Sequence, residues 1–156
     1  MDAPKTCIWG PNLWTILHSA AERIGTCILK RLPQEESRIW VGLLRSLQFT
    51  LPCPQCKKHY AKYLSTHPIL TFTKESIRSW LFVLHDLVNQ QTDKTENILT
   101  LDQIPSIYEQ PFHFSKHVNI VSHQMSSAVR LGWSSYDDTK RTIRLFEEMR
   151  RFYDFF

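Results

Sequence analysis

Apolar residues recur at three- and four-residue spacing along most of the chain, and this period predicts amphipathic helices. The strict alternation of apolar and polar residues that a half-buried strand would show is essentially missing. We therefore expect helices over residues 11–28, 34–49, 54–66, 74–88 and 101–108.

Proline and hydroxyl residues mark several of the expected helix ends. Gly10-Pro11 resembles a helix start, and Pro68 ends the third helix because the residue before a proline avoids helical backbone. Thr73 is a suitable N-cap for the fourth helix. Four helices with short connections and a short fifth predict an all-α four-helix bundle. This pattern argues against a thioredoxin fold, which needs βαβ units.

The chain changes character after residue 110. Residues 111–136 are rich in Ser, Gln, Asn and His, and we interpret them as a loosely ordered linker. A last helix is expected from Asp137 or Asp138, its cap, to the C-terminus, with an aromatic-rich face that packs on the bundle or binds a partner. The predicted organisation is a domain of residues 1–110 followed by a C-terminal extension of residues 111–156.

Composition narrows the classes of function. The 156 residues suffice for a domain with a real core, and the net charge of +4 comes mostly from dispersed basic residues, which argues against nucleic-acid binding. No run approaches the roughly 18 apolar residues of a membrane span, and the N-terminus shows no secretion signal. We therefore expect a cytoplasmic protein without a membrane anchor.

The motif Cys53-Pro54-Gln55-Cys56 is the strongest chemical signal, because it sets two thiols one helical turn apart. A helix that begins at Pro54 places Cys53 at its N-terminal end, where free backbone amides and the helix dipole stabilise a thiolate. Lys57, Lys58 and His59 add positive charge in the same turn. We expect a redox-active pair in which Cys53 is the more acidic thiol.

Two other interpretations of the cysteine pair stay open at this point. Cys-x-x-Cys is half of a tetrahedral zinc site, and His59, His67 or His85 could supply further ligands. The pair could also be an inert staple in a helical interaction module. His113 and His117 have the spacing of a two-histidine metal site but no evident third ligand, so we interpret them as surface histidines.

A dithiol that oxidises substrates needs an acceptor for the electrons, which directs attention to residues that can hold a redox cofactor. Trp14 and His18 lie one helical turn apart, and His85 and Asn89 repeat that relation on the fourth expected helix. Lys94 follows shortly after. Aromatic planes, imidazole or amide donors and a cation suit a ring system that carries a pyrophosphate.

Three motifs in this order and spacing resemble the Erv/ALR family of FAD-linked sulfhydryl oxidases, and the compact form looks most like the versions encoded by large cytoplasmic DNA viruses. The resemblance covers about residues 8 to 110. The motifs are Trp9-Gly10-Pro11-Asn12-Leu13-Trp14 with Leu17-His18, Leu51-Pro52-Cys53-Pro54-Gln55-Cys56, and Trp80 ahead of Leu84-His85-Asp86-Leu87-Val88-Asn89 and Lys94.

The resemblance implies a helical bundle that cradles FAD, with the cysteine pair beside the flavin ring. Cys56 would be the thiol next to the flavin, and Cys53 the thiol that exchanges with substrate. Electrons would pass from a substrate dithiol through the pair and the flavin to O2, which gives hydrogen peroxide. By position, the residues that would contact FAD are Trp14, His18, His59, His85, Asn89 and Lys94, with Gly10 allowing close approach.

The resemblance also implies partners. The substrate would be a dithiol protein, such as a small thioredoxin-like carrier, in a viral disulfide-forming pathway of the host cytoplasm or the virion. Family members are commonly homodimers, and the apolar first and second helices could supply the shared surface.

The chain departs from the family pattern at several points. Asp86 stands where members usually carry Asn, and a second cysteine pair that relays electrons in cellular members is missing. Cys7 and Cys27 do not replace that pair. If residues 11–27 are helical, the ends of this segment lie about 24 Å apart, too far for a disulfide. Substrate is therefore expected to reach Cys53 directly.

Overall fold

The structure is a computed structural model that describes residues 2–27, 33–92 and 100–156. Within these ranges every regular element is helical, which confirms the all-α class predicted from the sequence. The elements are α1 (Thr6–Ala21), α2 (Pro33–Thr50), α3 (Pro54–Thr66), α4 (Lys74–Gln91), the 3-10 helix η1 (Leu101–Gln103), α5 (Ile104–Tyr108), α6 (Phe114–Arg130) and α7 (Tyr136–Tyr153).

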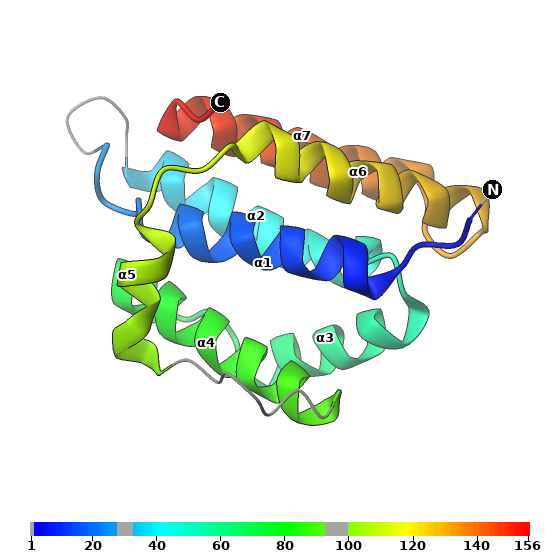
Figure 1. Cartoon of the computed structure of the whole chain (residues 1–156), viewed down its shortest axis with the longest axis horizontal. Helices are drawn as coiled ribbons and strands as arrows, with labels where there is room; N and C mark the ends of the chain where they lie inside the picture. The colour runs from blue at the N-terminus through cyan, green and yellow to red at the C-terminus, as the bar shows by residue number, and fades with distance from the viewer. Residues whose placement is uncertain (1, 28–32, 93–99) are drawn as a thin grey trace.

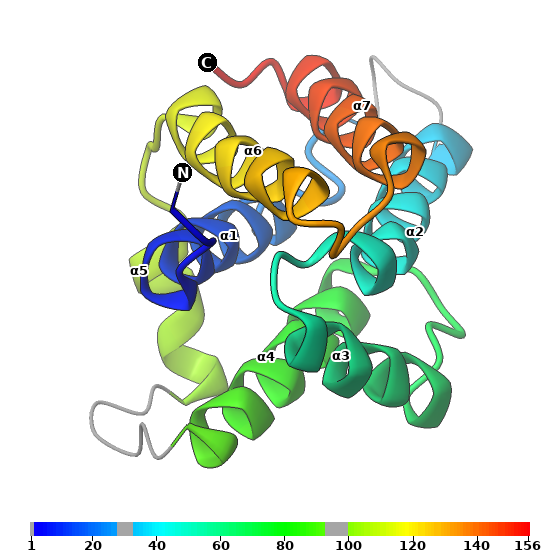
Figure 2. The ribbon, with the colours of Figure 1, turned by 90° about the vertical axis from the view of Figure 1, so that its right-hand side faces the viewer.

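The long helices form three layers of two (Figure 1). In that view α6 and α7 are the upper layer, α1 and α2 the middle layer, and α3 and α4 the lower layer. Figure 2 shows the same molecule turned by 90°, with α6 lying along α1 and α7 along α2. The middle layer is therefore covered from both sides.

Burial of α1 explains its sequence. Six consecutive residues, 16–21, are all buried, so this half of the helix touches protein in every direction. A helix enclosed in this way needs small or apolar residues all round and not on one face alone. Ala20 and Ala21 allow neighbouring helices to approach closely, and His18 and Ser19 are buried polar exceptions.

The predicted limits of the first helix were wrong at both ends. α1 begins at Thr6 and contains Pro11, which was expected to start it. It ends at Ala21, and the following turns include Gly25, whose φ of 86° is a left-handed conformation that glycine adopts without strain. The apolar stripe continues into this turn because Ile24 is buried there, so periodicity alone overextended the helix.

The next four predicted elements are confirmed. α2 and α3 lie within one residue of their expected limits at each end, and Thr73 caps α4 by accepting a hydrogen bond from the backbone N–H of Ser76 at 3.0 Å. The Ser76 hydroxyl returns a bond from the backbone N–H of Thr73, which completes a capping box. The short fifth element forms as η1 followed by α5.

The expected linker is instead largely a helix. α6 occupies residues 114–130, and its inward face consists of residues at three-, four- and seven-residue spacing. The many Ser, His and Gln residues between them lower the average hydropathy, which hid the stripe. The buried residues are Phe114, Val121, Met125, Ser127 and Ala128.

The cap predicted for the last helix was also wrong. Ser135 caps α7, and its hydroxyl accepts a hydrogen bond from the backbone N–H of Asp138 at 3.0 Å. Asp137 and Asp138 lie within the first turn, where their charges favour the positive end of the helix dipole.

Polar bonds fix α7 against α2 inside the core. The Thr142 hydroxyl lies 2.9 Å from that of Ser46 and 3.0 Å from that of Thr50, and all three residues are buried. At the other end of the interface Trp40 Nε1 donates to the Tyr153 hydroxyl at 2.9 Å. These bonds satisfy groups that would otherwise be costly to bury, so they select one alignment of the two helices.

An ion pair holds the end of α1 to α4. Arg78 of α4 reaches Glu22 with two nitrogens, at 2.9 and 2.7 Å, and the Glu22 side chain is fully buried. Two parallel bonds of this kind fix orientation as well as distance. The pair therefore sets the spacing between the middle and lower layers.

No helix within the described ranges is both long enough and apolar enough to cross a lipid bilayer.

The C-terminal helices share the core of the rest of the chain, which predicts a large stability effect at Phe146. Its side chain is fully buried, so Phe146→Ala should lower the free energy of unfolding in urea by about 3–5 kcal/mol. Tyr136→Ala on the same helix is the matched control. That residue is 66% exposed, and its loss should change stability by less than about 0.5 kcal/mol. Equal, small effects at both positions would mean that α7 is only loosely attached.

Candidate functional site

A cavity of about 290 Å³ is bordered mainly by α1, α3 and α4, with Leu47 of α2 at its wall. Its lining is mainly apolar and aromatic, with a few polar groups at the edge. Within the described ranges no residue of α6 or α7 lines it, because those helices lie on the other side of the middle layer. The cavity therefore belongs to the part of the chain before residue 110.

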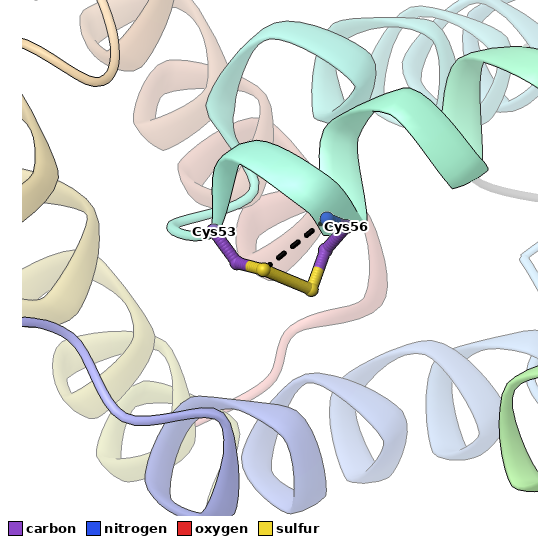
Figure 3. Close-up of a disulfide and its surroundings, with 2 residues drawn as sticks. All are labelled: Cys53 and Cys56. Atoms are coloured by element: carbon purple, nitrogen blue, oxygen red, sulfur yellow. Dashed lines mark hydrogen bonds between the residues drawn. A yellow bond between two sulfur atoms is a disulfide. The ribbon is translucent and has the colours of Figure 1, made fainter. Parts of the chain in front are cut away.

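Cys53 and Cys56 form a disulfide at the start of α3 (Figure 3), with Cα atoms 5.1 Å apart. Cys53 is the N-cap, Pro54 is the first helical residue, and the backbone N–H of Cys56 donates to Cys53 Sγ at 3.2 Å. The placement predicted from the sequence is confirmed. After reduction the same N–H and the helix N-terminus would stabilise a thiolate on Cys53.

The two cysteines have different surroundings. Cys56 lines the cavity, whereas Cys53 is not part of its wall, although both are half-buried. A group held in the cavity would therefore meet Cys56, and a molecule approaching from outside would meet Cys53.

Helix α3 is tied to three other parts of the chain. The Tyr60 hydroxyl donates to the carbonyl of Leu44 in α2, and the Tyr63 hydroxyl donates to that of Trp80 in α4 at 2.8 Å. Burial raises the pKa of Tyr63 to about 12 and also raises that of Tyr60, so both phenols remain protonated donors. These bonds hold the disulfide at the cavity wall.

Lys57 makes the third attachment. Its ammonium donates to the carbonyl of Trp133, in the loop between α6 and α7, and burial lowers its pKa while Asp138 opposes that change. Lys57 therefore has two roles: it carries the positive charge expected next to Cys56, and it bonds α3 to the loop between the C-terminal helices. Lys58 and His59 are exposed.

Stacked rings form the aromatic part of the site. The Trp14 and His85 rings are nearly parallel, with centroids 4.0 Å apart and an angle of 5° between their planes. His18 lies beside both, and its Nε2 shares a hydrogen bond with Nδ1 of His85 at 2.9 Å. Three residues singled out in the sequence are thus brought together from α1 and α4.

His18 is held neutral. Burial and then the nearby His85 lower its pKa from 6.5 to about 3, so near neutral pH it can donate or accept a hydrogen bond but carries no charge. The ring of Tyr108, from α5, also stacks with the His18 ring, with centroids 4.7 Å apart. Sequence reasoning missed Tyr108, because nothing in the short fifth helix indicated that it folds back onto α1.

The other predicted site residues have mixed positions. Gly10 and His59 line the cavity, whereas Asn89 is half-buried on α4 outside the lining. Lys94 lies outside the described residues. The sequence analysis did not predict that apolar residues would line the cavity, because it interpreted most of them as helix core. These residues include Leu13, Leu17, Leu47, Leu51 and Leu84.

One polar atom in the wall lacks a partner. Trp9 lines the cavity and is 6% exposed, and within the described ranges its Nε1 is buried without a hydrogen bond. An unsatisfied buried donor is costly, so it suggests a ligand that accepts this bond. Gly10 leaves space beside it, since a Cβ there would meet only Thr6 Cγ2 at 3.8 Å.

The zinc interpretation gains no support from the geometry. Over residues 2–27, 33–92 and 100–156, no three His, Cys, Asp or Glu side chains gather in a way that could hold a metal ion. The paired histidines of the sequence have other roles. His113 caps α6 by accepting from the backbone N–H of Lys116 at 3.2 Å, and His117 bonds to Asn12 at 2.7 Å. Cys7 and Cys27 are free thiols.

The low pKa of His18 predicts how stability depends on pH. Below pH 6.5 the unfolded chain takes up a proton at this ring, whereas the folded chain does not until about pH 3. Within that window His18 should make the free energy of unfolding fall by up to about 1.4 kcal/mol per pH unit of acidification. Urea denaturation of His18→Gln at several pH values should show a shallower slope than wild type. The control, His123→Gln at an exposed position, should keep the wild-type slope, and a retained slope in His18→Gln would refute the assignment.

Comparisons with known proteins assign the chain to a family. The family model described as the Erv1 / Alr family matches residues 11–110. A protein of Acanthamoeba polyphaga mimivirus is 30% identical over 90 residues, which are 55% of this chain and 59% of the relative. A protein of Frog virus 3 is 28% identical over 102 residues, 64% of this chain and 65% of the relative. Both carry names that describe them as FAD-linked sulfhydryl oxidases.

The matched segments thus span about three fifths of the length of these curated relatives. No solved structure matches the chain. The family match covers the disulfide, the stacked rings and the cavity lining except Thr6, Trp9 and Gly10, which precede it, and it ends before α6 begins. The chain belongs to the Erv1 / Alr family.

Proposed function

We propose that the chain is an FAD-dependent thiol oxidase that forms disulfide bonds in partner proteins. The observation that carries the proposal is the position of the Cys53–Cys56 disulfide, with Cys56 in the wall of a cavity that also contains Trp14. The names of the viral relatives support the same activity and the same cofactor. Oxygen is the proposed final acceptor, and hydrogen peroxide the product.

The cavity residues fit FAD. Trp14 offers an aromatic surface in the lining, and His85 stacks against Trp14 from outside the lining. The unpartnered Nε1 of Trp9 offers a donor to an oxygen or nitrogen of the cofactor. The proposed binding residues are Gly10, Trp14, His18, His59, His85, Asn89 and Lys94, to which the lining adds Trp9. When bound, FAD supplies a two-electron acceptor that reoxidises the cysteine pair and transfers the electrons to O2.

The cysteine pair would exchange with a client dithiol in two steps. A client thiolate attacks Sγ of Cys53, forms a mixed disulfide there and releases Cys56 as a thiolate. The second client thiolate then attacks the client sulfur of the mixed disulfide, which closes the client's disulfide and releases Cys53 as a thiolate. The client loses two electrons and two protons, and the Cys53–Cys56 pair gains them.

The surroundings of each sulfur support this order. Cys53 is outside the cavity wall and accepts the backbone N–H of Cys56, which would stabilise Cys53 as the leaving thiolate in the second step. Cys56 faces the cavity and so lies on the cofactor side. The anchors of α3 hold both sulfurs in register with the cavity.

The partners in this proposal are a dithiol protein and molecular oxygen. A thioredoxin-like carrier is a suitable client because it presents two thiols at an exposed helix start. The viral source of both relatives supports a role in a viral disulfide-forming pathway in the host cytoplasm or the virion.

The surface suggested by the sequence for a homodimer is occupied within the chain. The apolar sides of α1 and α2 that face away from the cavity pack against α6 and α7. A second subunit could not use that surface while α6 and α7 are in place. If the chain dimerises, the interface that we propose therefore lies elsewhere.

The cysteine assignments predict the behaviour of two variants. Purified wild-type protein should contain FAD and consume oxygen when given dithiothreitol. Cys53→Ala and Cys56→Ala should each abolish oxygen consumption and keep the cofactor, since the apolar and aromatic residues that form most of the cavity wall are unchanged. Cys27→Ala, which removes a free thiol outside the site, is the control and should keep full activity. Activity in either of the first two variants would contradict the assigned exchange.

The free donor of Trp9 predicts a contribution to cofactor affinity. Trp9→Phe keeps an aromatic ring and removes the N–H, so FAD should bind about two- to tenfold more weakly in equilibrium titration. Trp40→Phe is the matched control, because its N–H bonds to Tyr153 outside the cavity. An unchanged FAD affinity in Trp9→Phe would show that this atom does not meet the cofactor.

A further inference from the structure

A second hollow lies between α2 and α7, away from the cavity. It has a volume of about 430 Å³, and arginines from both helices line it. Arg38 and Arg45 come from α2, and Arg141 and Arg144 from α7. We call this hollow the arginine groove. All four side chains are exposed.

The bottom of the groove is tightly built. A Cβ at Gly42 would lie 3.3 Å from Cδ2 of Leu145, so the absence of a side chain allows α7 to come close to α2. Leu145 and Ser46 are buried beneath the arginines. Phe49 borders the groove with a side chain that is 48% exposed, which is unusual for an aromatic residue.

The arginines are mostly unneutralised. Glu148 is the acidic residue among the lining residues, and it pairs with Arg38 at 3.4 Å. Within the described ranges the guanidinium groups of Arg45, Arg141 and Arg144 have no carboxylate partner. Like charges held near one another repel, and a bound anion would relieve this repulsion.

The groove adjoins the segment that leads to the cysteine pair. Phe49 comes four residues before Cys53, and Thr50 bonds to Thr142, the residue after Arg141. Asp138, one turn before Arg141, interacts with Lys57 next to Cys56. A protein that presents its thiols to Cys53 would therefore have surface near this end of the groove.

We propose that the arginine groove binds an acidic segment of the client protein. This inference rests on the proposed function, because it assigns the groove to the client of that reaction. Guanidinium groups pair with carboxylates through two parallel bonds, and the Leu145 floor and Phe49 suit the apolar atoms of a peptide. Arg38 and Arg45 are seven residues apart, about 10 Å along the helix, which matches about three extended residues.

A peptide fits better than a nucleic acid. A nucleic acid follows a long basic track, whereas the arginines of the groove span about two turns of α2, and basic residues elsewhere are mostly dispersed. Free phosphate would use the arginines but not the apolar floor. The experiment therefore compares these three kinds of anion.

Binding is measured first without any thiol. A fluorescein-labelled, cysteine-free peptide with six consecutive Glu residues is titrated with the full chain, and anisotropy reports the affinity. The double variant Arg141→Gln and Arg144→Gln should bind about five- to tenfold more weakly than wild type. The control, Lys116→Gln and Lys140→Gln, loses the same two charges at exposed sites outside the groove and should bind within about twofold of wild type.

Turnover is then measured with two dithiol peptides that share a Cys-x-x-Cys sequence and differ in a tail of six Glu or six Gln residues. In wild type the Glu tail should lower KM and leave kcat unchanged, and the Arg141→Gln and Arg144→Gln variant should lose this advantage. Oxidation of dithiothreitol should be the same in wild type and in both double variants, because it needs no docking.

The outcomes separate the groove from the oxidase. If dithiothreitol is not oxidised at all, the proposed function fails, and the anisotropy arm still decides whether the groove binds acidic peptides. If dithiothreitol is oxidised but the peptide binds equally to wild type and the groove variant, the inference fails alone. Tighter arginine-dependent binding of a ten-residue thymidine oligonucleotide, or full displacement of the peptide by equimolar phosphate, would also overturn it.

Discussion

The enclosure of the C-terminal half of α1 fixes the position of the whole helix and, through it, of the site. One side of this helix packs against α6, and the other carries Trp9 and Trp14 into the cavity wall. Residues 16–21, which follow the two tryptophans along the helix, are all buried, so α1 cannot rotate or shift without losing contacts on several sides at once. The position of the aromatic rings is thus set by the packing of helices that never touch the cavity.

The disulfide is also positioned by contacts outside the cavity, namely hydrogen bonds that attach α3 to its neighbours. Helix α3 contributes few residues to the core. Its buried residues are Tyr60 and Tyr63, whose hydroxyls donate hydrogen bonds to α2 and α4. Lys57 adds a bond to the loop between α6 and α7. The C-terminal helices therefore support the site from behind and do not cover it. Helices α6 and α7 thus stabilise the part of the chain that holds the site, and we propose that the arginine groove between α2 and α7 adds to the surface that meets a client.

Local chemistry made much of this predictable. Pro54 after Cys53 and the Thr73 cap define the starts of α3 and α4, because each acts through backbone atoms a few residues away. Pairs such as Trp14 with His18 follow from helical spacing. Contacts between helices could not be predicted in this way. No local signal indicated that Tyr108 would stack on His18. The apolar stripe of α6 was hidden among polar residues, so its burial against α1 was not expected either. The prediction from Pro11 was wrong because α1 begins five residues before it, at Thr6, and continues through an exposed proline that was expected to mark a helix start.

We propose that the Cys53–Cys56 pair passes two electrons to a flavin held in the cavity. Anaerobic mixing of the FAD-loaded protein with one equivalent of dithiothreitol, followed by visible absorbance, tests it most directly. The account predicts rapid bleaching of the flavin in wild type and none on the same timescale in a Cys53→Ser and Cys56→Ser double variant. Bleaching at the same rate in both proteins would contradict it, because electrons would then reach the flavin without the cysteines.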